Sequence, residues 1–384
     1  MNWPNLPVSM MENKKKMRKI IGWIAAVIII LTIVGYNARQ EKIKSESGVF
    51  TIKAVIPLSG PLSIYAGDLK KGLNLAQQEI DSKYGAGKVK IELEDSASNP
   101  STVISIYQQK IAGNKNQAMI FIYSSTARAI KPLLDGSVIS VVTAAAGSNV
   151  ADADKKLYQI TLTLKDMMSS INSFVKDKGV KTASIMYSSD DYGLEGLTTF
   201  KEEFQKNSGQ VFDEIPIGMT EADFRLQILK ALEKNPEVFF VIGSGRSYFA
   251  ALTQLVSLGY KGIIVTDYSS TWPDFYKNNP DISEHIYSVT SVESDNFQEK
   301  YKPLGMNVLS IAPIYDISVI LADAYMTTGG DVEKMADYIE NLKDYNGALG
   351  KLTMQPQGNV HLPTQIVTTR NGELIPVNEK GETK

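Results

Sequence analysis

The chain contains no cysteine and only two histidines, His285 and His361, among its 384 residues. The absence of cysteine excludes a disulfide scaffold, a thiolate zinc site, a cysteine nucleophile and attachment through a lipidated N-terminal cysteine. Two histidines are too few for a histidine-rich metal site, and a catalytic dyad that needs one has few candidates. We therefore expect neither a metal nor a cofactor.

Neither sign of charge dominates the sequence. The formal net charge is -2, which argues against a nucleic-acid partner and against an acidic solvating tail. Hydrophobic residues make up 43% of the chain and charged residues 21%, as in ordinary globular proteins. The length is sufficient for two lobes that each bury a sizeable core.

Motifs of common enzyme classes are also missing. The chain has no G-x-x-x-x-G-K-[ST], no H-E-x-x-H and no G-x-S-x-G. Residues 243–247, GSGRS, are rich in glycine but lack the dinucleotide-binding spacing, and so predict a tight strand-to-helix turn. We expect a binding protein and no enzyme. The enzymatic alternative, an anchored hydrolase, would be detected by a turnover assay.

One long uncharged run, IIGWIAAVIIILTIVGY, occupies residues 20–36. It follows five basic residues between positions 14 and 19. A helix of this length extends roughly 25 Å at 1.5 Å per residue, and so just spans a hydrocarbon core about 30 Å thick. The basic cluster favours a cytoplasmic position for residues 1–19 and export of the remainder.

Two interpretations of this run remain open, an uncleaved signal anchor and a cleaved signal peptide. The cleavage pattern is poor, because Tyr36 stands where a small residue is needed if cleavage follows Ala38. We favour a single transmembrane helix at residues 20–36, followed by a polar linker at 37–48. In both interpretations the main body lies outside the cytoplasm, in the periplasm or at the cell surface.

From residue 49 onward, strand-like runs alternate with segments of helical period. Strands are expected at 50–58, 88–96, 118–125, 138–144, 182–189, 237–245 and 261–269, and helices at 68–83, 101–113, 126–134, 164–178, 193–208, 221–234, 247–258 and 311–328. This order predicts parallel, doubly wound sheets with right-handed crossovers. Because the units exceed one typical sheet, we expect two Rossmann-like lobes. The pair Asn371-Gly372 predicts a C-terminal hairpin.

Ligands of open α/β sheets bind at the carboxyl ends of strands, so strand-to-helix turns are the places to search. Four turns stand out, at residues 57–67, 123–126, 143–149 and 265–269. Hydroxyls and helix N–H groups in the second and third turns could hold a carboxylate. An aspartate in the fourth could pair with an ammonium. Taken singly, the first, second and fourth turns are better explained as ordinary turns or helix caps, and the third is explained as well by a flexible loop.

In the order and spacing of these segments, the chain resembles the leucine/isoleucine/valine-type family of periplasmic binding proteins, which have the type I solute-binding fold. The resemblance covers roughly residues 50–377. Its marks are IPLSGPLSIYAGDLKKGLNLAQQEID, IELEDSASNPSTVISIYQQKI, the Ser-Ser-Thr turn, DDYGLEGLTTFKEEF, ADFRLQILKALEKNPEVFFVIGSG and the ending YDISVILADAY.

The resemblance implies an α/β protein of two doubly wound lobes joined by three hinge crossovers. We place the crossovers near residues 162–164, 289–292 and 345–355. The first lobe would comprise residues 49–163 and 290–346, and the second lobe residues 164–289 and 347–384.

The resemblance also implies a carboxylate-binding side of the cleft. Ser125 and Thr126 match the hydroxyl turn that holds the ligand carboxylate, and Ala146 and Gly147 match the loop that supplies backbone contacts to it. Family members often carry a threonine where Gly147 stands. One carboxylate-binding hydroxyl is therefore lost, unless Ser148 replaces it through a one-residue shift.

On the other side, Asp267 falls where the family places an acid for the α-ammonium of the ligand. Tyr65 and Tyr192 match aromatic residues that cover the pocket from the two lobes. Ser244 matches a position beside the acid that is often aromatic, which predicts a larger or wetter pocket. The departures at Gly147 and Ser244 weaken the case for a branched-chain ligand.

The implied function is capture of a small amino-acid-like ligand outside the cytoplasm. Closure of the lobes would then present the ligand to the permease subunits of an ABC-type importer, with no chemical conversion. The alternative is a ligand-sensing extracellular domain that acts through a partner protein, because similar lobes also serve receptors and regulators.

Overall fold

The computed structural model of the protein describes residues 48–377. The run at residues 20–36, which we expect to be a membrane anchor, lies outside the described residues. Within residues 48–377, no helix is both long and apolar enough to cross a membrane. The residues from Phe50 onward belong to one compact unit.

The first sheet has five parallel strands in the order β2-β1-β3-β4-β5. The strands are β1 (Phe50–Ile56), β2 (Val89–Asp95), β3 (Gln117–Ile122), β4 (Ile139–Thr143) and β5 (Leu157–Gln159). Strands β3 and β4 are apolar on both faces, which is typical of a sheet covered by helices on both sides.

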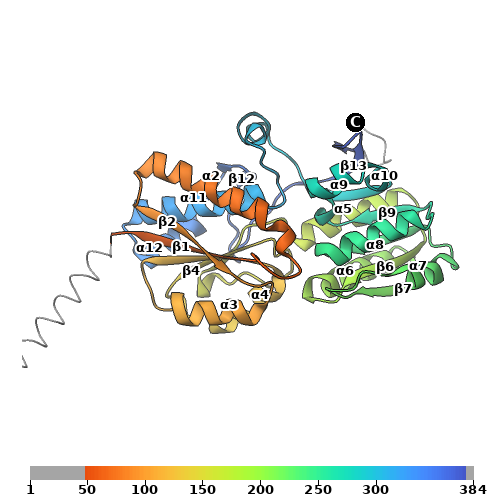
Figure 1. Cartoon of the computed structure of the whole chain (residues 1–384), viewed down its shortest axis with the longest axis horizontal. Coiled ribbons are helices and arrows are strands. Elements are labelled where there is room, and N and C mark those ends of the chain that lie inside the picture. Colours follow the sequence, from red (N-terminus) through yellow and green to blue (C-terminus); the bar gives the residue numbers. More distant parts are fainter. Residues whose placement is uncertain (1–47, 378–384) are drawn as a thin grey trace, which may run out of the picture. The chain divides into compact units, whose positions relative to one another are not determined.

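Helices cover both faces of this sheet (Figure 1). One face carries α2 (Ala66–Tyr84), α11 (Ile311–Thr328) and α12 (Val332–Glu340), and the other α3 (Pro100–Ile106), its π-helical extension η2 (Tyr107–Ile111) and α4 (Ser124–Ile130). The predicted helix at 311–328 is confirmed, and it ends at Gly329 in the left-handed conformation that favours glycine. We call this sheet with its helices the first lobe.

The second sheet has seven strands in the order β14-β13-β10-β9-β8-β6-β7. They are β6 (Thr182–Ser188), β7 (Gln210–Ile217), β8 (Val238–Ile242), β9 (Ile263–Thr266), β10 (Ile286–Ser291), β13 (Thr364–Arg370) and β14 (Glu373–Pro376). The first five are parallel, and β13 and β14 are antiparallel additions at one edge. Asn371 and Gly372 have positive φ between β13 and β14, so the predicted hairpin is confirmed.

Helices on both faces of this sheet complete the second lobe. They are α5 (Leu164–Asp177) and α6 (Asp191–Lys206) on one face, and α7 (Arg225–Leu232), α8 (Gly245–Ser257), α9 (Pro273–Asn278) and α10 (Pro280–Ser283) on the other. Side-chain oxygens of Thr163 and Asp190 accept hydrogen bonds from the first turns of α5 and α6, so the sequence specifies where both helices begin.

The chain passes between the lobes three times, and these crossovers are connected by backbone hydrogen bonds. The N–H of Val292 donates to the carbonyl of Pro363 at 2.9 Å, and the N–H of Val360 donates to the carbonyl of Gln159 at 3.2 Å. The first two crossovers follow β5 and β10, near the expected positions. Adjacent crossover strands of this kind can act together as a hinge.

The third crossover differs from the expectation, which assigned residues 347 onward to the second lobe. Strands β11 (Tyr345–Gly347) and β12 (Gly350–Leu352) pair with each other, and the N–H groups of Ala348 and Leu349 donate to the buried Asp316 of α11. The chain reaches the second sheet only at Thr364. The contact with Asp316 therefore places this segment with the first lobe.

Candidate functional site

A pocket lies between the lobes, where the carboxyl ends of strands from both sheets meet. Its lining residues are Tyr65, Leu69, Ile122, Tyr123, Ala144, Leu309 and Ser310 from the first lobe and Ser244, Tyr268 and Ser269 from the second. The pocket is partly open to solvent. Since ligands of doubly wound sheets bind at this edge, this pocket is the candidate site.

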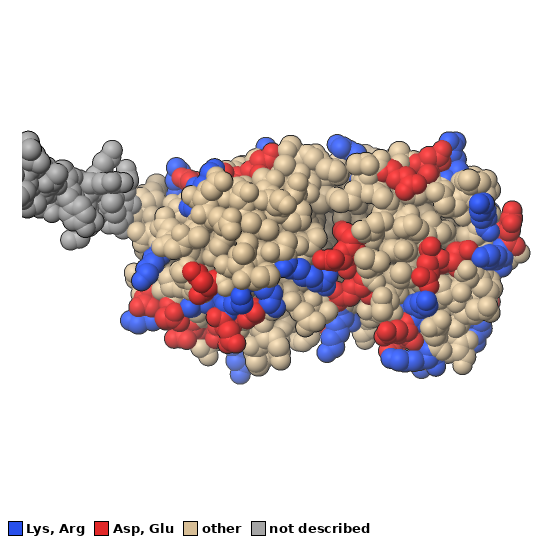
Figure 2. Space-filling view, turned by 90° about the horizontal axis from the view of Figure 1, so that it is seen from below, with Lys and Arg blue, Asp and Glu red and all other residues tan. Residues whose placement is uncertain are grey.

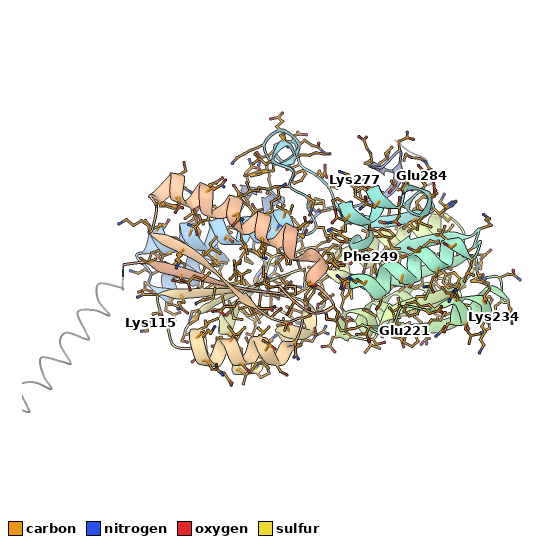
Figure 3. All side chains as sticks on the ribbon, viewed as in Figure 1. Lys115, Glu221, Lys234, Phe249, Lys277 and Glu284 are labelled. Atoms are coloured by element: carbon orange, nitrogen blue, oxygen red, sulfur yellow. The ribbon has the colours of Figure 1, made fainter. Side chains whose placement is uncertain are left out.

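Aromatic side chains connect the two lobes across the pocket. Phe249 of α8, labelled in Figure 3, stacks on Trp272 with ring centroids 5.5 Å apart. Trp272 meets the ring of Tyr65 edge-on at 5.1 Å, and its Nε1 donates to Asp68 at 3.3 Å. The Tyr65 hydroxyl accepts a hydrogen bond from the N–H of Gly245 at 3.2 Å. These contacts therefore bring the two lobes together beside Tyr65, which lines the pocket.

Tyr123 is a pocket residue that sequence reasoning missed. It ends β3 and precedes α4 with φ 78° and ψ 142°, a backbone conformation that bulky side chains rarely adopt. Its ring lines the pocket, and its hydroxyl has no hydrogen-bond partner among residues 48–377. Burial raises the pKa of Tyr123 well above the usual range, so the hydroxyl stays protonated. The turn at 123–126 was singled out, but only for its serines and threonine.

On the side of the cleft where we expect the carboxylate, most of the predicted groups contact other parts of the protein. Neither Ser125 nor Thr126 lines the pocket, although both lie in the first turn of α4. Ser124, which was not predicted, is buried, and its Oγ accepts a hydrogen bond from the N–H of Gly147 at 3.0 Å. The carbonyl of Ala146 accepts from the N–H of Leu164 at 2.6 Å. The backbone groups of Ala146 and Gly147 therefore bond to α5 and α4 of the protein itself.

Ser148 contacts the second lobe through its backbone. Its N–H donates to the Glu195 carboxylate at 2.7 Å, and its carbonyl accepts from Arg128 at 3.2 Å. Arg128 and Glu195 also form an ion pair. Ser148 itself is exposed. We expected its hydroxyl to face the ligand, but it does not line the pocket, because the loop faces Glu195 of α6 at this point.

Asp267 is enclosed by protein donors, in contrast to the expectation that it faces a ligand ammonium. One oxygen accepts from the N–H of Gly243 and the hydroxyl of Tyr192, both at 2.9 Å. The other accepts from the N–H of Ser269 at 2.9 Å and the hydroxyl of Tyr248 at 3.1 Å. Its side chain is fully buried and outside the pocket lining. Burial raises the pKa of Asp267 to about 6, although the four hydrogen-bond donors act to lower it.

Of the nine predicted site residues, only Tyr65 and Ser244 therefore line the pocket. Tyr192 serves as a donor to Asp267 rather than as a pocket wall. A neighbouring pocket includes Asp190 and shares Ser244 with the first. Ser244 is the N-cap residue before α8, and its side chain makes no capping hydrogen bond, so its hydroxyl is available to the cleft.

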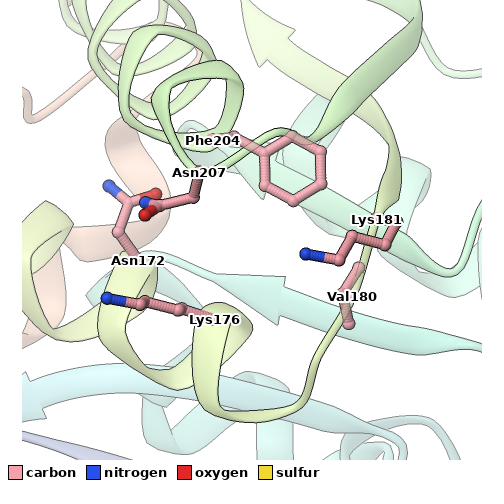
Figure 4. A pocket seen from close by; sticks show the side chains of 6 residues that line it. All are labelled: Asn172, Lys176, Val180, Lys181, Phe204 and Asn207. Atoms are coloured by element: carbon pink, nitrogen blue, oxygen red, sulfur yellow. The ribbon is translucent and has the colours of Figure 1, made fainter.

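A separate pocket lies between the C-terminal ends of α5 and α6, away from the cleft (Figure 4). Its lining residues are Asn172, Lys176, Val180, Lys181, Phe204 and Asn207. Lysines near helix C-termini complement the partial negative charge of the last carbonyl groups.

Elsewhere, Lys and Arg are interspersed with Asp and Glu over the face drawn in Figure 2, in agreement with the near-neutral net charge.

Two doubly wound lobes, three crossovers and a pocket between opposing strand ends define the class of two-lobed solute-binding proteins. Over residues 50–372 the chain matches the model of a family described as "Periplasmic binding protein", and the protein belongs to this family. The resemblance to the leucine/isoleucine/valine-type members is thereby confirmed.

The chain is 24% identical over 217 residues to Leu/Ile/Val-binding protein homolog 6 of Brucella abortus, and the match covers 56% of each chain. The chain thus spans about half the length of the curated relatives it matches. Among solved structures, it is similar to the branched-chain amino acid transporter substrate-binding protein LivJ from Streptococcus pneumoniae in complex with isoleucine, with 18% identity, a TM-score of 0.76 and coverage of 85% of this chain and 97% of that one.

A solute-binding protein of an ABC transporter from R. palustris, in complex with benzoate, is similar at 15% identity with a TM-score of 0.77. That match covers 88% of this chain and 98% of the other. At such identities the solved structures establish the shared fold.

Proposed function

We propose that the protein captures a small organic solute between its lobes, outside the cytoplasm, and presents it to the permease of an ABC-type importer without converting it. The observation that carries this proposal is the pocket whose walls come from both sheets. A solute there contacts both lobes at once, so its binding energy can favour the closed arrangement.

The relatives support this assignment. The family name denotes proteins that act in the periplasm. The S. pneumoniae protein is described with isoleucine and the R. palustris protein with benzoate, each as part of a transporter. Small organic solutes with an apolar body are therefore the class to test first.

We further propose that residues 20–36 hold the body at the membrane as a single-pass anchor, with residues 37–48 as a tether. The chain has no cysteine to carry a lipid, and the basic cluster before the run favours this orientation. The anchor is tested by fractionation of cells that express the full chain. Recovery of the intact protein in membranes supports it, and recovery of a shortened soluble form supports the cleaved alternative.

Solute capture is tested by thermal shift of residues 48–384, which contain the compact unit that begins at Phe50. A library of amino acids, amides and small carboxylates serves as probe, because a ligand at 100 times its Kd stabilises the folded state by about 2.7 kcal/mol. Ser244→Trp should abolish the shift by filling the pocket. Ser257→Trp, an exposed position at the end of the same helix, is the matched control.

Transport is then tested by uptake of a labelled hit in cells with and without the gene. Loss of uptake on deletion supports import. Unchanged uptake together with a tight ligand favours the sensing alternative. If no library member binds, or if Ser244→Trp leaves binding intact, the pocket is not the site.

A further inference from the structure

The pocket between the lobes is lined by hydroxyl groups and apolar surface. None of its ten lining residues is an Asp, Glu, Lys, Arg or His. Burial raises the pKa of Tyr65 and Tyr268 far above neutrality, as it does for Tyr123, so the three phenols are uncharged. The side chains that line the pocket therefore carry no formal charge.

The acidic groups nearest the pocket already have protein partners. Asp267 accepts four hydrogen bonds and is fully buried. One oxygen of Asp68 accepts from Trp272, Asn307 and Ser310. Asp190, in the neighbouring pocket, accepts from the Ser188 hydroxyl and the N–H of Gly193. None of these three aspartates is among the lining residues, so a solute ammonium in the pocket has no carboxylate partner among the side chains that line it.

A solute carboxylate would not find a cation among the lining residues either. Arg128, which lies on the helix that follows Tyr123, forms ion pairs with Glu195 and Asp191. A buried carboxylate needs a cation or several hydrogen-bond donors to offset its desolvation, whereas a buried neutral polar group needs only a hydrogen bond. Hydroxyls both donate and accept hydrogen bonds, and so satisfy amides and alcohols.

We propose that the pocket selects an uncharged solute, with an aliphatic or aromatic body and hydroxyl or amide groups, over a zwitterionic amino acid of the same shape. The proposal rests on the proposed function, because it concerns the solute of the same site. Tyr65, Tyr123 and Tyr268 cover the body with their rings, and Leu69, Ile122 and Leu309 supply the remaining apolar wall. An uncharged solute is then favoured, because the lining side chains offer no partner of opposite charge to an ammonium or a carboxylate.

Isosteric probes that differ in charge test this selection directly. One series is 4-methylpentanamide, 4-methylpentanoate and L-leucine, and the other is 3-phenylpropanamide, 3-phenylpropanoate and L-phenylalanine. We expect titration calorimetry at pH 7.5 to show that at least one amide binds roughly 10-fold or more tightly than its carboxylate, and that the amino acid of that series is weakest.

Tyr123→Phe tests whether the free hydroxyl contacts the solute. The affinity for the better amide should fall roughly 3- to 10-fold, because one hydrogen bond is lost. Tyr325→Phe is the matched control, since Tyr325 stacks on Phe50 at 4.2 Å and does not line the pocket. Equal losses in both variants would contradict a contact between Tyr123 and the solute.

The remaining outcomes separate this inference from the proposed function. If an amino acid or a carboxylate binds most tightly and Ser244→Trp abolishes that binding, the inference is overturned and solute capture is supported. If none of the six probes binds but another library member does, an uncharged member supports the inference. A charged member overturns it. If nothing binds, both proposals fail.

Discussion

Arg128 of α4 and Glu195 of α6 form an ion pair that joins the first lobe to the second at the rim of the cleft. The same carboxylate accepts the N–H of Ser148, and Arg128 also lies 3.5 Å from a carboxylate oxygen of Asp191. An ideal Cβ on Gly147 would lie 2.8 Å from the Arg128 guanidinium and 3.1 Å from the Glu195 carboxylate, so the loop packs closely against the pair. The pair therefore connects the two lobes in the arrangement that the structure shows.

Glu195→Gln should shift the protein toward the open state and weaken solute binding. The pair is partly exposed, so we expect a loss of roughly 2- to 5-fold in affinity, which corresponds to about 0.5–1 kcal/mol. Small-angle scattering of the solute-free protein should show a larger radius of gyration. Glu203→Gln is the control, because Glu203 pairs with Lys206 on the same helix. Equal effects of both substitutions would exclude a specific role for the pair.

Asp267→Ala should destabilise the second lobe, because it leaves two N–H groups and two tyrosine hydroxyls without their acceptor. We expect a loss on the order of 3 kcal/mol or more in the free energy of unfolding, measured with urea. Asp267→Asn, which retains one acceptor oxygen, should lose less. If Asp267→Ala keeps its stability and loses only amino-acid affinity, Asp267 binds the ammonium directly, as the family resemblance implied.

Gly193→Ala should also destabilise the protein, because α6 approaches the end of β6 closely. An ideal Cβ on Gly193 would lie 2.0 Å from the carbonyl oxygen of Ser188. Backbone must shift to remove such an overlap, and we expect a cost of about 1–3 kcal/mol. Gly67→Ala in the first turn of α2 is the control, since its Cβ would meet nothing within 4 Å. Comparable thermal stability of Gly193→Ala and wild type would contradict the close approach.

Most of the fold could be predicted from sequence because the decisive signals are local. Turn residues predicted the hairpin at Asn371-Gly372, and the helix at 311–328 was predicted from its own residues. The lobe to which residues 347–360 belong was not predictable in this way. It depends on Asp316 and Gln159, which contact the segment from far away in the chain.

The site was less accessible to sequence reasoning, since its properties arise from contacts across the fold. The four donors around Asp267 come from three separate turns and helices, and their convergence has no local signature. The positive φ of Tyr123 is equally invisible in a sequence, because non-glycine residues rarely adopt it. Tyr65 was found because a tyrosine in a Gly- and Pro-rich turn after a strand is a local feature.

The buried carboxyl of Asp316 should make stability depend on pH. Its pKa is raised to about 7, chiefly by burial and also by the charge of Glu79, although the N–H groups of Leu349 and Ala348 and the charge of Lys300 act to lower it. The unfolded chain loses this proton near pH 3.8, whereas the native state retains it up to about pH 7. Between these values the native state binds more protons, so stability falls as pH rises.

We therefore expect wild type to be more stable at pH 5 than at pH 8, by on the order of 1–3 kcal/mol. Asp316→Asn should be less stable at low pH, because it loses one acceptor for the N–H groups of Ala348 and Leu349, but its stability should change less between pH 5 and pH 8. A smaller slope should remain below about pH 6, since burial also raises the pKa of Asp267. Asp337→Asn, at an exposed position of α12, is the control and should keep the full slope. Urea unfolding at closely spaced pH values measures these slopes, and identical slopes for wild type and Asp316→Asn would show that Asp316 is already ionised in the native protein at pH 5.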